Sequence, residues 1–126
     1  MVDFLVEQGV SAKTINRVEV IFEELVSNTI RHGFVPGSAQ IIHVRAHIAA
    51  KAVELTFEDD GIAFNPLEQA APAPFTSIGD ATLGGLGIPL VLRLTESAAY
   101  TPLLEGAPDA AGPFRNRFVV RVSTQT

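Results

Sequence analysis

A carboxylate and a carboxamide lie four residues apart in a stretch that otherwise has the composition of a core helix. The stretch Glu-Glu-Leu-Val-Ser-Asn-Thr-Ile-Arg-His-Gly spans residues 23–33 and carries this pair as Glu24 and Asn28. A four-residue step places both side chains on one face of a helix, so both can point at one ligand. The alternative is a polar stripe that faces solvent, which is the more common arrangement for an arbitrary helix.

A second candidate is the stretch Glu-Asp-Asp-Gly-Ile-Ala-Phe-Asn-Pro, residues 58–66, which follows an alternating apolar segment. Asp59 and Gly61 there offer a carboxylate and a glycine at the end of a buried strand, where a flat ligand can meet the backbone. An ordinary turn is the alternative, because Asp-Gly is a common turn signal.

The third candidate is the glycine-rich stretch Leu-Gly-Gly-Leu-Gly-Ile, residues 83–88, which leads into a helical pattern. Its glycines would let the backbone approach phosphate oxygens, and the free amides of the first helical turn would point at them. The Gly-Lys-Ser/Thr ending of a P-loop is absent, and no buried parallel strand precedes the stretch, as the dinucleotide-binding fingerprint requires. A flexible connection is the alternative for a lone glycine cluster.

The rest of the chain predicts the elements that would position these three stretches. Ser11 suits the N-cap of a helix that runs to His32 and stops at Gly33. Residues 40–49 and 52–58 alternate in polarity, which predicts a hairpin with one buried face. The remaining expected elements are a helix at about 86–98 and strands near 98–104 and 114–122. This order predicts a two-layer α+β fold, with helices on one face of a mostly antiparallel, mixed sheet.

The composition limits both the size and the partners of the protein. A chain of 126 residues has room for one domain, which we expect to span residues 1–126. The net charge of −5 argues against non-specific binding to nucleic acid or to an anionic membrane, although backbone amides and Mg²⁺ can still hold a nucleotide. The chain has no cysteine, no apolar run of ~18 residues and no basic start of a signal peptide. We therefore expect a cytoplasmic protein.

Taken together and in this order, the three stretches resemble the N box and the two glycine boxes of the histidine-kinase-like ATPase superfamily. The segments EELVSNTIRHG, DDGIAFNP and GGLGIPLVLRL are most similar to the branch of anti-sigma factor serine/threonine kinases. The resemblance covers about residues 11–122 and implies the two-layer ATP-binding fold of that superfamily. No phosphoacceptor-histidine region accompanies it, so autophosphorylation on a histidine is not expected.

The resemblance implies roles for the residues of the first stretch. Asn28 would bind Mg²⁺, and Glu24 would be the general base that deprotonates the acceptor hydroxyl. Glu23 lies 100° round the helix and would only support it. Arg31 falls where the family often has a basic residue near the phosphates. His32 could equally be a helix C-terminal residue that the helix dipole favours.

The resemblance also implies how ATP would be held by the other two stretches. Asp59 would accept a hydrogen bond from the adenine amino group, and Gly61 and Ala63 would lie close to the base. Guanine presents a carbonyl oxygen at that position, which favours ATP over GTP by roughly 1–3 kcal/mol or more. Residues 67–83 would form a lid. The phosphates would be cradled by residues of the second glycine box, namely Gly84, Gly85, Leu86 and Gly87.

The chain departs from the family pattern in four places. Ala63 stands where a second glycine is usual, and the final strand, Arg-Phe-Val-Val-Arg-Val, has no hydroxyl residue of the kind that relatives use near the adenine. The chain starts inside the family's first helix, so the first edge strand is expected to be missing. That strand often contributes to dimerisation, which leaves a homodimer open. The linker at 105–113 is also longer than usual.

The expected function is a Mg²⁺- and ATP-dependent serine/threonine kinase that phosphorylates an anti-sigma-factor antagonist of the STAS type and sequesters a sigma factor. One alternative is a non-catalytic ATP-binding module that controls a phosphatase or another partner. A second alternative is a scaffold that binds no nucleotide. Glu24 favours the kinase over the binding module, because a pure binder needs no base.

Overall fold

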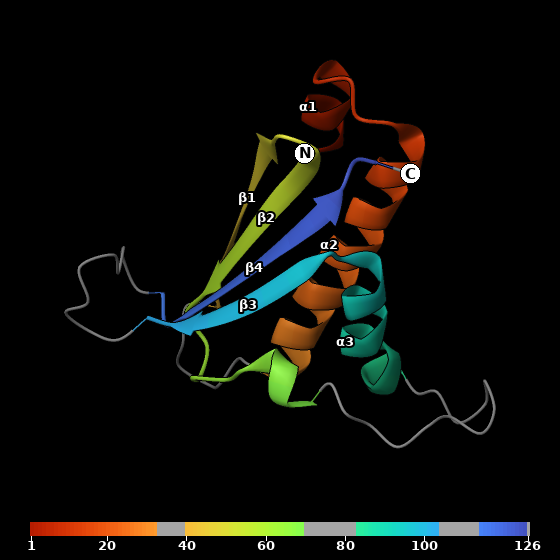
Figure 1. Ribbon diagram of the computed structural model, residues 1–126. Coiled ribbons are helices and arrows are strands. Elements are labelled where there is room, and N and C mark those ends of the chain that lie inside the picture. Colours follow the sequence, from red (N-terminus) through yellow and green to blue (C-terminus); the bar gives the residue numbers. More distant parts are fainter. Residues whose placement is uncertain (33–39, 70–82, 104–113, 126) are drawn as a thin grey trace.

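The computed structural model describes residues 1–32, 40–69, 83–103 and 114–125 (Figure 1). Three α-helices, one short 3₁₀ helix and four strands make up these parts of the chain. No helix among them combines the length and apolar character that crossing a membrane requires. In chain order the elements are α1 (Val2–Glu7), α2 (Ala12–His32), β1 (Ile42–Ala49), β2 (Ala52–Asp59), η1 (Pro66–Gln69), α3 (Leu83–Leu94), β3 (Ser97–Pro102) and β4 (Asn116–Ser123).

The four described strands form one sheet in the order β1-β2-β4-β3, and every neighbouring pair is antiparallel. The three α-helices lie on one face of this sheet (Figure 1). This confirms the expected α+β arrangement of helices on one face of a sheet. The register places Asp59, the last residue of β2, directly opposite Asn116, the first residue of β4.

The core fills the space between the helices and the sheet. The buried side chains of α2 include Val18, Ile21 and Leu25, which recur at three- and four-residue steps. They pack in one cluster with sheet residues such as Leu55 and Val120, which are fully buried. The helix starts as predicted, because the Thr14 amide donates to the Ser11 hydroxyl at 3.2 Å. The N-cap at Ser11 predicted α2, and the alternation of residues 40–49 and 52–58 predicted the hairpin of the sheet.

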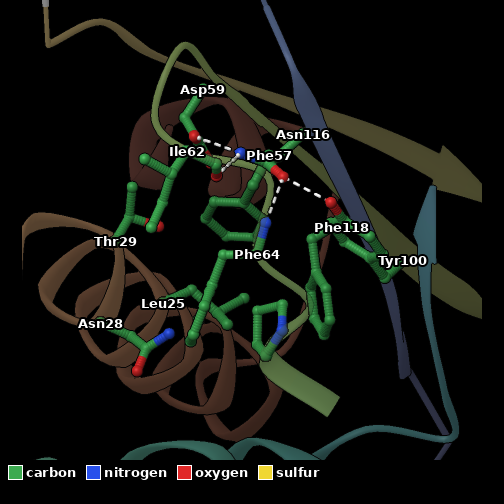
Figure 2. Close-up of a pocket in the computed structure, with 11 residues that line it drawn as sticks. Leu25, Asn28, Thr29, Phe57, Asp59, Ile62, Phe64, Tyr100, Asn116 and Phe118 are labelled. Atoms are coloured by element: carbon green, nitrogen blue, oxygen red, sulfur yellow. Dashed lines mark hydrogen bonds between the residues drawn. The ribbon is translucent and has the colours of Figure 1, made fainter. Parts of the chain in front are cut away.

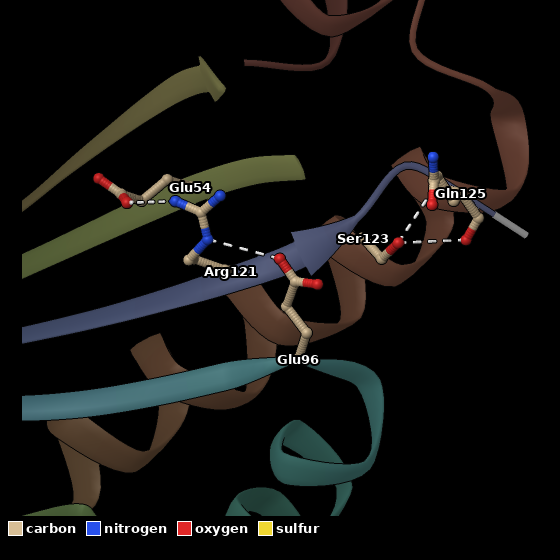
Figure 3. Close-up of polar contacts among 5 residues, drawn as sticks. All are labelled: Glu54, Glu96, Arg121, Ser123 and Gln125. Carbon is tan, nitrogen blue, oxygen red and sulfur yellow. Dashed lines mark hydrogen bonds and ion pairs between the residues drawn. The ribbon is translucent and has the colours of Figure 1, made fainter. Parts of the chain in front are cut away.

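The opposite face of the sheet carries charged side chains. Arg121 on β4 contacts Glu54 on β2 at 3.1 Å and Glu96, just before β3, at 3.4 Å (Figure 3). Glu58, whose side chain is only 5% exposed, pairs with Arg117 at 2.9 Å and with Arg45 at 3.5 Å. These pairs span neighbouring strands, so they stabilise the sheet register that sets Asp59 opposite Asn116.

The helix α3 differs from its predicted bounds, since it spans Leu83–Leu94 rather than about 86–98. Its first five residues include three glycines, each of which disfavours a helix by roughly 1 kcal/mol. Packing overrides this cost, because Ile88 and Val91 of α3 are buried in the shared core. The helix ends early because the Glu96 amide already donates to Arg121 O at 2.8 Å, which pulls the chain into the sheet.

The expected lid and linker fall mostly on residues that the structure does not describe. Of the lid predicted at 67–83, residues 67–69 belong to the 3₁₀ helix η1, Leu83 begins α3, and 70–82 lie outside the described residues. The linker predicted at 105–113 lies outside them as well.

Candidate functional site

A small cavity lies between α2, the end of β2 and the segment that follows it. Asn28 reaches it from the helix side, and Asp59 and Asn116 reach it from the sheet side (Figure 2). Its free volume is about 20 Å³, which is room for about one water molecule. The lining residues are Leu25, Asn28, Thr29, Phe57, Asp59, Ile62, Phe64, Pro66, Tyr100, Asn116 and Phe118.

A purine is much larger than this cavity, so it can enter only if lining side chains move outward. Ile62 is 39% exposed and belongs to the irregular segment after β2, so it is free to move more easily than the core residues. Phe64, in the same segment, stacks on His32 at the end of α2, with ring centroids 6.1 Å apart and planes 20° from parallel. This ring contact joins the segment after β2 to the helix.

Asp59 stands at the centre of a hydrogen-bond network at the sheet end of the cavity. Its Oδ1 atom accepts bonds from the Gly61 amide and from Asn116 Nδ2, both at 2.9 Å (Figure 2). Burial raises the pKa of Asp59 above its ordinary value of 3.8, although these two hydrogen bonds oppose the rise and the nearby charge of Asp60 adds to it. The cavity therefore contains a partly buried carboxylate that costs energy to ionise.

Asn28 is a buried polar residue whose amide lacks a partner. Its side chain is 6% exposed, and Nδ2 makes no hydrogen bond with any described residue. A buried donor without a partner costs about 1–3 kcal/mol. A buried donor without a partner that faces a cavity is expected where a ligand supplies the missing hydrogen bond. A carboxamide offers an oxygen to a cation such as Mg²⁺ and an N–H to a phosphate oxygen.

The first and third stretches of the sequence meet at Glu24 and Gly87. A β-carbon added to Gly87 would lie 3.2 Å from Glu24 Oε2, which is closer than an ordinary contact. The absence of a side chain at Gly87 thus leaves room for the Glu24 carboxylate beside α3. Within the described part of the chain, no group of three or more acidic or histidine side chains could hold a metal ion by itself.

The remaining predicted residues lie around this arrangement. Arg31 is exposed and lines a separate groove of about 350 Å³ on the outer side of α2, together with Glu23, Glu24, Ser27 and Ile30. Gly61 is buried beside Asp59, whereas Ala63 is exposed and does not line the cavity. Gly84, Gly85 and Leu86 belong to the first turns of α3. The structure thus brings Asn28 and Asp59 to one cavity and Glu24 to Gly87, and it leaves Arg31 and Ala63 outside that cavity.

Sequence reasoning did not find Asn116 and Tyr100. Asn116 is 5% exposed and bonds to Asp59, and the Tyr100 hydroxyl donates to Asn116 Oδ1. The family pattern places a hydroxyl residue within the last strand, whereas the polar residue of this chain stands one position before the segment Arg-Phe-Val-Val-Arg-Val. A polar residue at the very start of an apolar strand was the available signal.

Comparison with known proteins identifies the family of this chain. The model of the histidine kinase-like ATPase domain matches residues 1–106, which include all three sequence stretches. The chain belongs to the histidine kinase-like ATPase domain family. The superfamily resemblance of the three boxes is thereby confirmed, and the antiparallel sheet with helices on one face is consistent with the α+β fold of this ATPase family.

Relatives of this histidine kinase-like ATPase domain include two kinds of regulatory protein. The serine/threonine-protein kinase BtrW of Bordetella bronchiseptica is 30% identical over 78 residues, which are 62% of this chain and 55% of the relative. An anti-sigma F factor of Clostridium novyi is 29% identical over 84 residues, 67% of this chain and 59% of the relative. An anti-sigma F factor of Clostridium perfringens is 23% identical over 94 residues, 75% and 67% of the two chains. This chain spans little more than half the length of the first two relatives.

Proposed function

We propose that this protein is an ATP-dependent serine/threonine protein kinase of the anti-sigma-factor type. The observation that carries the proposal is the proximity of Glu24 Oε2 to Gly87, at 3.2 Å from the place of an added β-carbon. It puts a carboxylate one turn from the start of α3, where the backbone amides of the first turn have no helical partners and can bind phosphate oxygens. A base next to a phosphate site is the minimum that phosphoryl transfer to a hydroxyl requires.

Asn28 is the residue that would hold Mg²⁺ in this proposal. Its carboxamide oxygen would be the ligand, and its unpartnered Nδ2 could donate to a phosphate oxygen. No group of three or more acidic or histidine side chains among the described residues could hold a metal, so the cation would share its ligands with phosphate oxygens and water. When bound, Mg²⁺ neutralises charge that develops on the phosphates. Asn28 therefore positions the phosphate tail one helical turn from Glu24.

Asp59 would determine the preference for adenine over guanine. Its carboxylate faces the cavity from the sheet end and can accept the hydrogen bond that the adenine amino group donates. A guanine would present an oxygen to it, which leaves two acceptors facing each other at a cost of roughly 1–3 kcal/mol. Gly61, Gly84, Gly85, Leu86 and Gly87 remain backbone contacts of the proposed nucleotide site, and Arg31 reaches the phosphates only from the outer groove.

Glu24 would act as the general base. It takes the proton of a serine or threonine hydroxyl as the oxygen of that hydroxyl bonds to the γ-phosphorus and the bond to the ADP leaving group breaks. Such a base contributes about 10²–10⁴-fold to the rate. The half-exposed position of Glu24, at the border of the outer groove, leaves it open to a protein substrate.

The names of the relatives support the choice of partners. By analogy with the anti-sigma F factors, we propose that this protein binds a sigma factor, and that its phosphorylated substrate is a STAS-type antagonist of the anti-sigma factor. The kinase name of the Bordetella relative supports the transfer reaction. The same analogy leads us to propose a cytoplasmic location and a homodimer.

The transfer reaction can be tested with radiolabelled Mg·ATP and a candidate antagonist. We expect label on the antagonist with wild type and with Glu23→Gln, and at least a hundredfold slower labelling with Glu24→Gln. Glu23 is the matched control, because it is the adjacent carboxylate on the outer groove. Undiminished transfer by Glu24→Gln would refute the role of the base. ATP binding without any transfer by wild type would instead support the non-catalytic regulatory module.

A further inference from the structure

The proposed nucleotide contacts leave one buried polar side chain of the cavity without a role. Asn116 is 5% exposed, begins β4 and lies directly opposite Asp59 in the sheet. Figure 2 shows its carboxamide between Asp59, the segment after β2 and Tyr100. A buried polar residue with this many partners fixes the positions of several groups at once.

All the hydrogen-bonding capacity of the Asn116 carboxamide is used. Its Nδ2 donates to Asp59 Oδ1 at 2.9 Å and to Ile62 O at 2.8 Å. Its Oδ1 accepts from the Phe64 amide at 3.1 Å and from the Tyr100 hydroxyl. The two donors and the two lone pairs of a carboxamide are thereby satisfied.

These partners fit a carboxamide and no other side chain of this size. The Asp59 carboxylate and the Ile62 carbonyl can only accept, so each needs an N–H or O–H from position 116. The Phe64 amide can only donate, so it needs an acceptor there. An ionised aspartate has no donor, and a serine or threonine hydroxyl has one donor where two are needed.

The network decides which oxygen of Asp59 is available to a ligand. Oδ1 is occupied by the Gly61 amide and by Asn116, whereas Oδ2 receives no hydrogen bond from the part of the chain that the structure describes. The same carboxamide fixes the carbonyl of Ile62 and the amide of Phe64, two residues that line the cavity. Asn116 thus determines which oxygen of Asp59 is free to accept a hydrogen bond, and it fixes the backbone of residues 62 and 64 at the edge of the cavity.

We propose that Asn116 is a positioning residue for base recognition, which holds Asp59 so that Oδ2 is the acceptor for the amino group of an adenine base. Tyr100 assists by holding Asn116 through its Oδ1 atom. The inference rests on the proposed nucleotide site, and it assigns part of the preference for adenine over guanine to a residue that itself need not touch the base.

Calorimetric titration of wild type, Asn116→Leu and Tyr100→Phe with Mg·ATP and with Mg·GTP tests this role. Leucine has nearly the shape of asparagine without its hydrogen bonds, so the Asp59 carboxylate can turn. We expect the ratio of GTP to ATP dissociation constants to fall about tenfold or more in Asn116→Leu. Tyr100→Phe removes one bond to Asn116 but none to Asp59, so it should lower the ratio less than Asn116→Leu does.

A second variant keeps the test decisive if Asn116→Leu does not fold. In Asn116→Asp the side chain keeps its shape but can donate to Asp59 only when protonated. A protonated aspartate supplies one of the two donors, so the ATP affinity of this variant, taken relative to wild type at the same pH, should recover in part as the pH is lowered from 8 to 5. A purely structural role of Asn116 predicts that the affinities for ATP and GTP recover together, whereas the proposed role predicts that the preference for ATP recovers.

The outcomes separate this inference from the proposed function. A folded wild type that binds neither nucleotide would overturn the proposed nucleotide site and this inference with it. A wild type that prefers ATP, together with a folded Asn116→Leu that keeps the same preference, would overturn only the role of Asn116. An Asn116→Asp variant whose relative affinity does not change with pH would overturn it as well.

Discussion

Replacing Asn28 by leucine should stabilise the protein while it abolishes nucleotide binding. The side chain of Asn28 is 6% exposed, and its Nδ2 atom has no partner among the described residues. Leucine has a similar shape and would face the apolar lining that Leu25, Phe57 and Phe118 provide. The substitution therefore removes an unsatisfied donor and adds an apolar contact in the same space.

The size of the effect follows from the lost desolvation penalty. An orphaned buried donor costs about 1–3 kcal/mol, so the free energy of unfolding without ligand should rise by up to that amount. For a domain of 126 residues, each kcal/mol corresponds to roughly 3–5 °C in Tm. With ATP at a hundred times its Kd, wild type should gain about 2.7 kcal/mol, and Asn28→Leu should gain nothing.

Thermal unfolding with and without saturating Mg·ATP measures both effects. We expect Asn28→Leu to melt above wild type without ligand and to show no shift with Mg·ATP. Ser27→Ala, one residue earlier and outside the cavity, is the control and should change neither value by more than about 0.5 kcal/mol. If Asn28→Leu melts below wild type and its Tm still rises with Mg·ATP, Asn28 is neither an unsatisfied buried donor nor a residue of the nucleotide site.

Three further predictions concern the neighbours of the cavity. Gly87→Ala would displace the Glu24 carboxylate by a few tenths of an ångström. Label transfer to an antagonist should therefore slow about tenfold, while Tm stays equal or rises. An unchanged rate of transfer would contradict this. Because burial raises the pKa of Asp59, the free energy of unfolding of wild type falls as the pH rises from 3.8 through that pKa. Denaturant unfolding should therefore show Asp59→Asn to be more stable than wild type at pH 7, and this difference in unfolding free energy should vanish near pH 4. His32→Ala removes a ring contact of about 0.5–1.5 kcal/mol that holds Phe64, so calorimetry should show ATP binding up to about tenfold tighter, and weaker binding would count against an opening of the cavity at Phe64.

Local sequence patterns predicted the elements whose packing they directly encode. The N-cap at Ser11 and the stop after His32 predicted the bounds of α2. The three- and four-residue spacing of Ile15, Val18 and Leu25 predicted its buried face, whereas Phe22, in the same spacing, is 36% exposed. The alternation in residues 40–49 and 52–58 likewise predicted the β1–β2 hairpin, whose inward face is buried on β2 and half-buried on β1. These signals are local, so one sequence is enough to read them.

The contacts that complete the site could not be predicted in the same way. The bond between Asp59 and Asn116 joins residues 57 positions apart, and it exists because the sheet register sets them opposite each other. The approach of Glu24 to Gly87 depends on the packing of α3 against α2, which also overrode the glycines that concealed the start of α3. Tertiary packing decides such contacts, and the local pattern does not contain it.

Calorimetric titration of the folded wild type with ATP tests directly whether this protein has a nucleotide site. We expect one nucleotide per chain, tighter binding of ATP than of GTP, and weaker binding of ATP once Mg²⁺ is removed. No binding signal with ATP or ADP, from a protein whose helices and sheet are intact by circular dichroism, would show that the cavity between Asn28 and Asp59 is not a nucleotide site.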